Sequence, residues 1–326
     1  MVILQVGRLL LAAVLAFGVG KLVARLGLPS ILGWLITGMA LGPHALGLLQ
    51  SDVLDSDWFS AAESILECTV GLMIGTELLW GKLKKAGKQI VVTTITESLG
   101  TFAVVSLVFG AIFWAVGVPV YLAFLFGGIA LATAPAPSLS IVNQMKTSGP
   151  VTSTLIPMAA LDDLVGALVF FTVVAFVSAH ISTAGVPVGV VLFLVFLPVL
   201  IGLATGFAAG RLMRKMRTQR TALAVMLAML LASAGIGFAI NRALPSPVLN
   251  FMLIGMGYST MFANMISAEQ LAGIMKVMDP VIGLGLIVVI LNLGAPLDYH
   301  LIFGAGLYTA IYIAARAVEI GRASCR

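Results

Sequence analysis

The chain has 326 residues, of which 60% are hydrophobic and only 10% are charged, and its mean hydropathy is +1.14. Soluble domains carry about 25% charged residues, so this composition excludes an ordinary soluble protein and indicates a polytopic membrane protein. The two cysteines and three histidines show no metal-ligand spacing, and no G-x-G-x-x-G fingerprint opens a βαβ unit. We therefore expect no metal site, no cofactor and no enzymatic activity.

Apolar runs predict about eleven membrane-spanning helices, several of them near or below the usual length of about 20 residues. No small-residue cleavage site follows the first run, so we interpret it as a retained helix and not as a signal peptide. In chain order the predicted spans are 2–24, 29–42, 61–79, 89–116, 120–143, 152–178, 186–210, 221–241, 247–263, 273–292 and 301–318.

Basic residues concentrate in alternate loops, and this pattern predicts the orientation of the chain. One set of loops carries Arg25, Lys82, Lys84, Lys85, Lys88, Lys146, Arg211, Arg214, Lys215, Arg217 and Arg220. The intervening loops carry Asp52, Asp55 and Asp57, with Arg242 as the basic exception. Positive loops face the cytoplasm, so we expect a multi-pass protein with its N-terminus outside. The net charge of +5 then reports orientation and predicts no nucleic-acid partner.

The fifth predicted span contains the run ATAPAPS, residues 132–138. Pro135 and Pro137 lack the amide proton that a regular helix requires, so the helix is expected to break there. Such backbone survives at membrane depth only against protein or a water-filled cavity, where Thr133 and Ser138 could help to coordinate a cation. A simple packing kink is the alternative interpretation.

The sixth predicted span places two adjacent carboxyl groups, Asp162 and Asp163, inside an apolar run. A carboxylate near the centre of a membrane helix costs about 2.5–3.5 kcal/mol on insertion scales. Because such a cost is usually retained for ion or proton transport, these residues are the candidate cation- and proton-binding groups. Neighbours on a helix point about 100° apart, so the two cannot share one proton as a facing pair would.

Two motifs recur at nearly the same offset and predict an internal repeat. The run LPSILGWLITGM (28–39) resembles LPSPVLNFMLIGM (244–256), and LMIGTEL (72–78) resembles LNLGAPL (291–297). The two copies would cross the membrane in opposite directions, which is the inverted-topology plan of many secondary transporters.

The repeat suggests how the chain is divided. We expect a first six-helix repeat at 1–178, a linker helix and basic loop at 179–219, and a partial second repeat at 220–318. Residues 319–326 break the apolar pattern and resemble a translated adaptor, so they are expected to be a non-native tail. A pair of helices would then be missing from the second repeat, and the chain alone would not transport.

Four stretches together resemble the cation:proton antiporter superfamily, specifically the electrogenic Asp-Asp branch of sodium/proton antiporters. They are residues 26–43, 72–78, 132–138 and 160–166. The resemblance implies a fold with about thirteen helices, a discontinuous crossing helix, and a homodimer in which a six-helix core moves against a dimerisation domain. It also implies the inner (plasma) membrane of a prokaryote.

The resemblance assigns roles to individual residues. Asp163 resembles the essential cation- and proton-binding carboxylate, and Asp162 resembles the additional acid of the electrogenic branch, which would give two protons per sodium ion. Thr133 and Ala134 resemble the unwound residues beside the site. The lysine that pairs with the first acid in some members has no counterpart here, because Lys276 lies near the start of the tenth span.

Three further polar residues could support the site. Asn292 is the polar residue within the tenth span, and Glu97 and Arg316 could pair between the fourth and eleventh spans, although two separate near-interface side chains are an equal alternative.

Four functions remain open from the sequence. The first is exchange of a monovalent cation, Na⁺ before Li⁺ or K⁺, for protons. The second is a K⁺/H⁺ exchanger, and the third is a sensor or scaffold that keeps the fold without transport. The fourth, an intramembrane aspartyl protease, is disfavoured because its two carboxyls must face each other from different helices.

Overall fold

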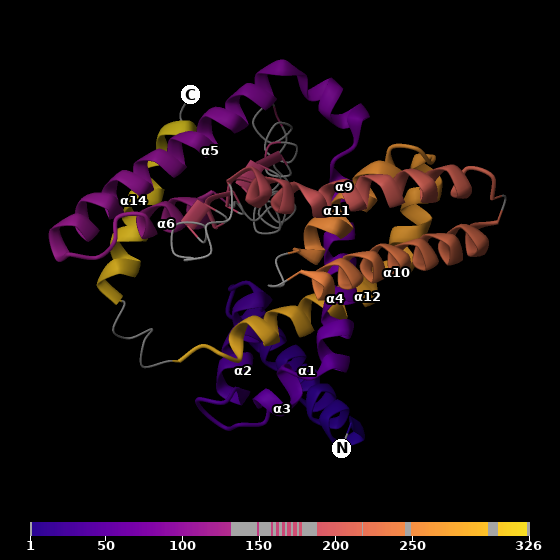
Figure 1. The fold of residues 1–326 in the computed structure, drawn as a ribbon, viewed down its shortest axis with the longest axis horizontal. Coiled ribbons are helices and arrows are strands. Elements are labelled where there is room, and N and C mark those ends of the chain that lie inside the picture. Colours follow the sequence, from indigo (N-terminus) through magenta and orange to yellow (C-terminus); the bar gives the residue numbers. More distant parts are fainter. Residues whose placement is uncertain are drawn as a thin grey trace. The chain divides into compact units, whose positions relative to one another are not determined.

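In the computed structural model every regular element of the described residues is a helix (Figure 1). Five of these helices are long and apolar enough to cross a membrane, at Val2–Arg25, Ile90–Val116, Phe196–Met213, Gln219–Ala243 and Ala268–Gly294. The chain is therefore an all-α polytopic membrane protein, as its composition predicts. The described residues are 2–131, 149, 158, 161–162, 165–166, 168–170, 172–174, 176–177, 188–216, 218–244, 249–298 and 306–324.

The chain forms two compact units, each assembled from two separate stretches of sequence. Unit 1 contains Met1–Thr76 and Pro198–Gly304, and unit 2 contains Glu77–Leu197 and Ala305–Arg326. Each unit combines segments from both halves of the chain. The units follow spatial contacts, whereas the predicted repeats follow sequence similarity, so the two divisions describe different properties.

Unit 1 contains most of the long helices. Two of them begin at a side-chain cap: the Asn250 side chain accepts a hydrogen bond from the Leu253 amide, and Ser267 accepts one from Gln270. The Ser267 cap starts its helix five residues before the predicted tenth span. The helices are α1 (Val2–Arg25), α2 (Ser30–Leu41), α3 (Ser51–Leu54), α4 (Asp57–Glu77), α9 (Val188–Met213, from Pro198), α10 (Gln219–Ala243), α11 (Phe251–Ala263) and α12 (Ala268–Gly294).

Helix α11 lies at the centre of unit 1, and ten of its thirteen residues are buried. It packs closely on two neighbours. Gly255 meets the backbone of α4 at Cys68, and Gly257 meets the backbone of α9 near Val199. A Cβ atom on Gly255 would overlap the Cys68 carbonyl oxygen. Small residues thus bring these backbones together, as is usual for helices packed in lipid.

The repeated motifs are in contact with each other in unit 1, in a crossed arrangement. Gly38 of α2 lies against Leu291 and Gly294 of α12, while Gly255 of α11 lies against α4 at Cys68. Gly38 and Gly255 occupy the same place in the two similar motifs 28–39 and 244–256. Gly38 packs on α12, which carries most of the motif 291–297, and Gly255 packs on α4, which carries most of the motif 72–78. Each half of the predicted repeat therefore completes the packing of the other.

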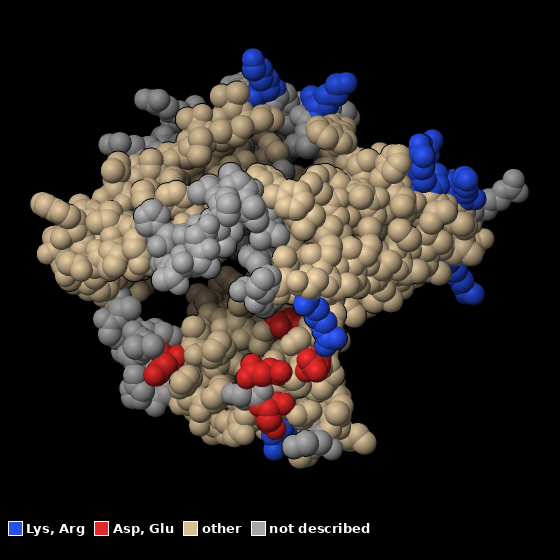
Figure 2. All heavy atoms as spheres, in the orientation of Figure 1, with Lys and Arg blue, Asp and Glu red and all other residues tan. Residues whose placement is uncertain are grey.

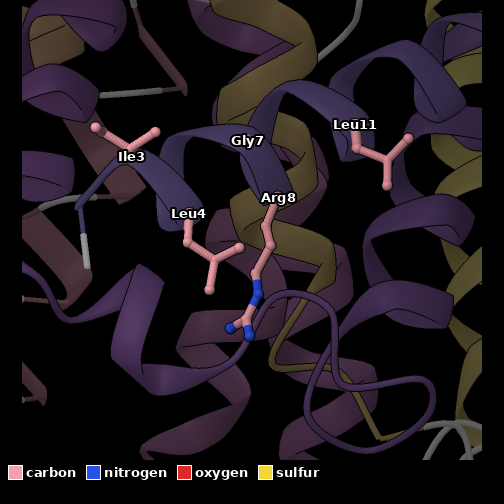
Figure 3. Close-up of a pocket in the computed structure, with 5 residues that line it drawn as sticks. All are labelled: Ile3, Leu4, Gly7, Arg8 and Leu11. Atoms are coloured by element: carbon pink, nitrogen blue, oxygen red, sulfur yellow. The ribbon is translucent and has the colours of Figure 1, made fainter.

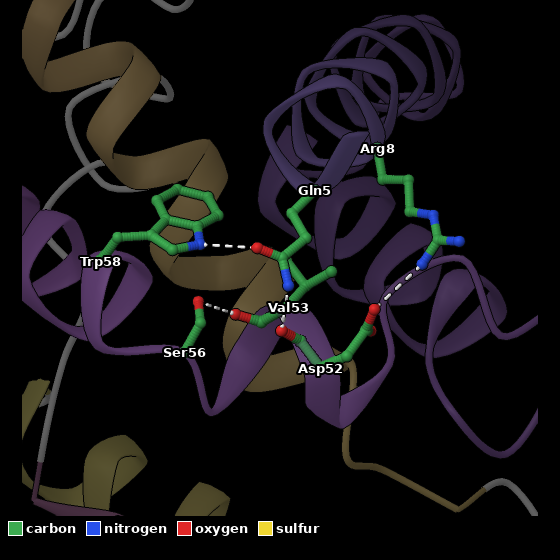
Figure 4. A network of polar contacts seen from close by, with 6 residues as sticks. All are labelled: Gln5, Arg8, Asp52, Val53, Ser56 and Trp58. Atoms are coloured by element: carbon green, nitrogen blue, oxygen red, sulfur yellow. Dashed lines mark hydrogen bonds and ion pairs between the residues drawn. The ribbon is translucent and has the colours of Figure 1, made fainter. Parts of the chain in front are cut away.

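Polar contacts hold the beginning of α1 against α3 and α4 (Figure 4). Gln5 donates to the backbone oxygen of Asp52 at 2.6 Å and accepts from the Trp58 indole at 3.0 Å. Arg8 forms an ion pair with the Asp52 carboxylate at 3.3 Å. These contacts satisfy the buried amide of Gln5 and fix the loop between α2 and α4.

Charges separate to the two ends of unit 1. Acidic side chains gather around the start of α1 and α4 (Figure 2), where Arg242 at the end of α10 pairs with Asp57 at 3.7 Å. Arg220 lies in the first turn of α10, about 33 Å along the helix from Arg242 at 1.5 Å per residue. Near it in sequence, Arg211 in the last turn of α9 and Arg214 and Lys215 just after α9 have exposed side chains. Arg242, the one basic residue predicted among the acidic loops, thus pairs with an acidic residue of those loops, Asp57.

Unit 2 contains α5 (Trp80–Val116), α6 (Leu122–Ala130) and α14 (Gly306–Ser324), and α5 packs against both of the others (Figure 1). Ring contacts join them: Phe109 stacks on Phe126 at 4.4 Å between centroids, and Tyr308 and Tyr312 pack edge-on against Phe113 and Phe109. Helix α14 continues through residues 319–324, the start of the predicted tail. Helix α5 begins nine residues before the predicted fourth span, because its first turns carry helix-forming but charged residues.

Candidate functional site

Of the two predicted acids, Asp162 lies within the described part of the chain and Asp163 lies outside it. The predicted break in the fifth span also lies outside the described residues, at Thr133, Ala134, Pro135, Pro137 and Ser138. The roles of Asp163 and of this break stay predictions. Helix α6 ends at Ala130, two residues before that run. Around Asp162, the described residues between 158 and 177 are helical, as the sixth span predicts.

Asp162 is buried in unit 2 and hydrogen-bonded to α5. Its side chain accepts a bond from the Ser98 hydroxyl, with 2.5 Å between Ser98 Oγ and Asp162 Oδ1. Ser98 is 1% exposed and Asp162 is 4% exposed, so bulk water does not compete for this bond. Two turns further along, Phe170 packs on Gly128 of α6. The segment that bears the acid is therefore held by both α5 and α6.

Sequence reasoning missed Ser98, which lies on a polar face of α5. Thr94, Ser98 and Thr101 are all nearly fully buried, and their spacing of four and three residues places them on one side of a helix. Thr94 uses its hydroxyl to bond the Ile90 carbonyl one turn earlier. The signal was this hydroxyl periodicity within an otherwise apolar run, but it does not reveal which hydroxyl meets an acid.

The predicted pair of Glu97 and Arg316 lies on two helices that pack together. Glu97 is half-buried on α5, one residue before Ser98, and Arg316 belongs to α14. The side chain of Arg316 is outside the described part of the structure. Their pairing stays a prediction.

Asn292 lies in unit 1 and bonds an acid there. Its side-chain amide donates to Glu63 Oε1, so α12 and α4 are joined by a polar contact. Glu67 follows Glu63 by one turn of α4, and both are half-buried. The described partner of Asn292 is thus a glutamate of unit 1, whereas Asp162 belongs to unit 2.

A surface pocket on α1 has a different chemical character (Figure 3). It is lined by Ile3, Leu4, Gly7, Arg8 and Leu11, all from one helix, and its walls are mostly apolar. Gly7 leaves the space open because it has no side chain. No carboxylate lines this pocket, so the buried acid of unit 2 is the better candidate for binding a cation or a proton.

The environment of Asp162 suits both of those ligands. A carboxylate and nearby hydroxyl groups offer the oxygen atoms that hard cations prefer, and a buried carboxyl can exchange its charge for a proton. The role of Asp162 as a cation- and proton-binding group stays a prediction.

Comparison with known proteins bears on the family and the fold of the chain. The model of a family described as "Sodium/hydrogen exchanger, transmembrane" matches residues 10–323. Among curated proteins, none matches the chain in sequence.

Solved structures of a sodium proton antiporter, MjNhaP1 from Methanocaldococcus jannaschii, have a similar fold. One, at pH 8, has a TM-score of 0.71 and 19% identity over 99% of this chain and 78% of that chain. A second, determined by electron microscopy, has a TM-score of 0.65 and 19% identity over 91% and 71% of the two chains. At this identity the likeness concerns the fold.

Proposed function

Because the chain belongs to the sodium/hydrogen exchanger family, a family of cation/proton transporters and not of enzymes, we propose that it exchanges Na⁺ for protons across the membrane. The observation that links the proposal to particular residues is the buried carboxyl of Asp162, which Asp163 follows in the sequence. We propose that the cation and a proton compete for Asp163, and that competition for one site couples the two fluxes.

The division into two units suggests how access could alternate. Unit 2 contains both aspartates and the stretch of the predicted helix break, 132–138. We propose that unit 2 is the part that carries the cation, and that unit 1 is the part through which two copies associate. The antiporter fold supports this assignment, since inverted-repeat transporters commonly move one bundle against another.

The proposed orientation places the acidic end of unit 1 outside and its basic end in the cytoplasm. Support comes from the separation of Asp52 and Asp57 from Arg211, Arg214 and Arg220, because cytoplasmic loops carry the excess of Lys and Arg. In a prokaryote this corresponds to the inner membrane with an external N-terminus.

Cation-induced proton movement in everted vesicles, with the protein expressed from its completed gene, tests the proposal. An acridine dye reports the pH gradient while Na⁺, Li⁺ and K⁺ are added in turn, with Asp163→Asn in parallel. Dequenching by Na⁺ that Asp163→Asn abolishes is the expected result. A response to K⁺ alone would indicate the potassium exchanger, and no response in well-inserted wild-type protein across roughly pH 6.5–9 would indicate a scaffold.

A further inference from the structure

The contact between Asp162 and Ser98 shows which neighbour the first of the two adjacent aspartates has. Neighbouring side chains on a helix point about 100° apart, and Asp162 is turned to α5, where Ser98 Oγ lies 2.5 Å from its carboxyl oxygen. On a regular helix the sequence then predicts that Asp163 faces another side.

The chemical identity of the partner matters, because a hydroxyl can serve both charge states of a carboxyl. Towards an ionised carboxylate Ser98 donates its O–H, and towards a protonated carboxyl the same oxygen can accept. An ammonium or guanidinium group only donates, so it would favour the ionised form alone. A hydroxyl lets Asp162 gain and lose a proton without losing its partner.

Other charged groups could also act on Asp162. The charged residues on the neighbouring elements of unit 2 are Asp163 next to it in sequence, Glu97 on α5, and Arg316, Glu319 and Arg322 on α14, while α6 carries none. Helix α5 also carries lysines, Lys82 to Lys88, in its first turns. The nearest of these, Lys88, precedes Ser98 by ten residues, which is about 15 Å along the helix.

We propose that Ser98 is a positioning residue that holds Asp162 against α5, and that the wild-type pH profile of exchange depends on this contact. The proposal rests on the proposed function, and it names a partner for the first acid that the sequence analysis left without one. Asp162 then acts as a proton-carrying group beside the cation site at Asp163.

The variant Ser98→Ala, measured in the vesicle assay across a pH series, tests this role. Hydrogen bonds to a charged group are stronger than those to a neutral one, so loss of the hydroxyl penalises the ionised form more. The half-maximal pH of Na⁺-driven exchange is expected to rise by about one unit. The apparent affinity for Na⁺ at saturating alkaline pH is expected to change less than about twofold, because Asp163 is intact.

Three further variants distinguish positioning from a general structural effect. Ser98→Thr keeps a hydroxyl and is expected to restore the wild-type pH profile. Ser106→Ala removes another buried serine of α5, whose hydroxyl has no hydrogen-bond partner among the described residues, and should leave the profile unchanged. In an Asp162→Asn background, Ser98→Ala should add no further shift, as expected for two residues that act through one contact.

The outcomes separate this proposal from the proposed function. If the wild type exchanges Na⁺ and Ser98→Ala keeps its pH profile, the role of Ser98 is wrong while the exchanger stands. An equal shift in Ser106→Ala, or a shift that persists in the Asp162→Asn background, would also overturn it. Absence of exchange in the wild type contradicts the proposed function itself.

Discussion

The polar residues inside the membrane helices differ in the kind of partner each one has. Asp162 in unit 2 meets a hydroxyl, that of Ser98, whereas Glu63 in unit 1 meets an amide, that of Asn292. The side-chain NH₂ of an asparagine only donates, so it matches a carboxylate. The first contact suits a group that changes its charge, and the second suits a fixed link between α4 and α12.

The contact between Asn292 and Glu63 predicts a stability effect. Asn292→Ala would leave a half-buried carboxyl without its donor, at a cost of about 1–3 kcal/mol in the free energy of unfolding. The apparent melting temperature in detergent should fall accordingly. Arg242→Ala removes an exposed ion pair with Asp57 and serves as the control, since such pairs contribute about 1 kcal/mol or less. Equal melting temperatures for the two variants would contradict the prediction.

Loss of exchange without loss of stability would assign Asn292 a different role. The sequence predicts Asn292 as a residue that supports the cation site. If Asn292→Ala unfolds at the wild-type temperature but no longer moves protons in response to Na⁺, that supporting role is correct. The same pair of measurements thus separates a structural link from a contribution to transport.

At the scale of helices, the crossed packing of the repeated motifs gives unit 1 its core. Helix α2 packs on α12 through Gly38, and α11 packs on α4 through Gly255. The two glycines are equivalent in the repeat, and both allow backbones to touch. Such contacts gain dispersion energy in lipid, where no hydrophobic force draws helices together.

The close approach at Gly255 predicts that even a methyl group is too large there. Gly255→Ala would place its Cβ against the Cys68 carbonyl oxygen, and overpacking of this kind costs about 1–3 kcal/mol. We expect a lower melting temperature in detergent. Gly235→Ala on α10 is the matched control, because nothing lies within 4 Å of its Cβ position and alanine favours a helix. A melting temperature for Gly255→Ala at or above that of Gly235→Ala would refute the packing argument.

Helix ends were predicted less well than helix positions. Among the described residues, every helix except the short α3 lies on a predicted span, but α5 begins at Trp80 and α12 at Ala268, both before their apolar runs. The early turns are polar or charged and are stabilised by helix-forming residues and by the Ser267 cap. A hydropathy pattern marks only the part of a helix that lies in the bilayer, so it does not show where the helix begins outside the bilayer.

At the scale of the whole molecule, the distribution of charge predicts the orientation in the membrane. Single cysteines in a background without Cys68 and Cys325 can report it, at exposed positions of the two ends of unit 1. Asp55→Cys should react with a membrane-impermeant maleimide in intact cells, and Thr218→Cys only in everted vesicles, because positive loops stay in the cytoplasm. The reverse labelling pattern would invert the proposed topology.

The sequence alone determined the membrane class and the order of the predicted spans, because these depend on local composition and on the bilayer as solvent. The exchanger family was indicated by the resemblance of four motif stretches, and the acid on the sixth span by its place in an apolar run. The partners of the polar groups were decided by the tertiary structure. Ser98 and Asp162 are 64 residues apart, and Asn292 and Glu63 are 229 apart. Periodicity shows that a hydroxyl or an amide faces the interior, but which acid it meets depends on how distant helices pack.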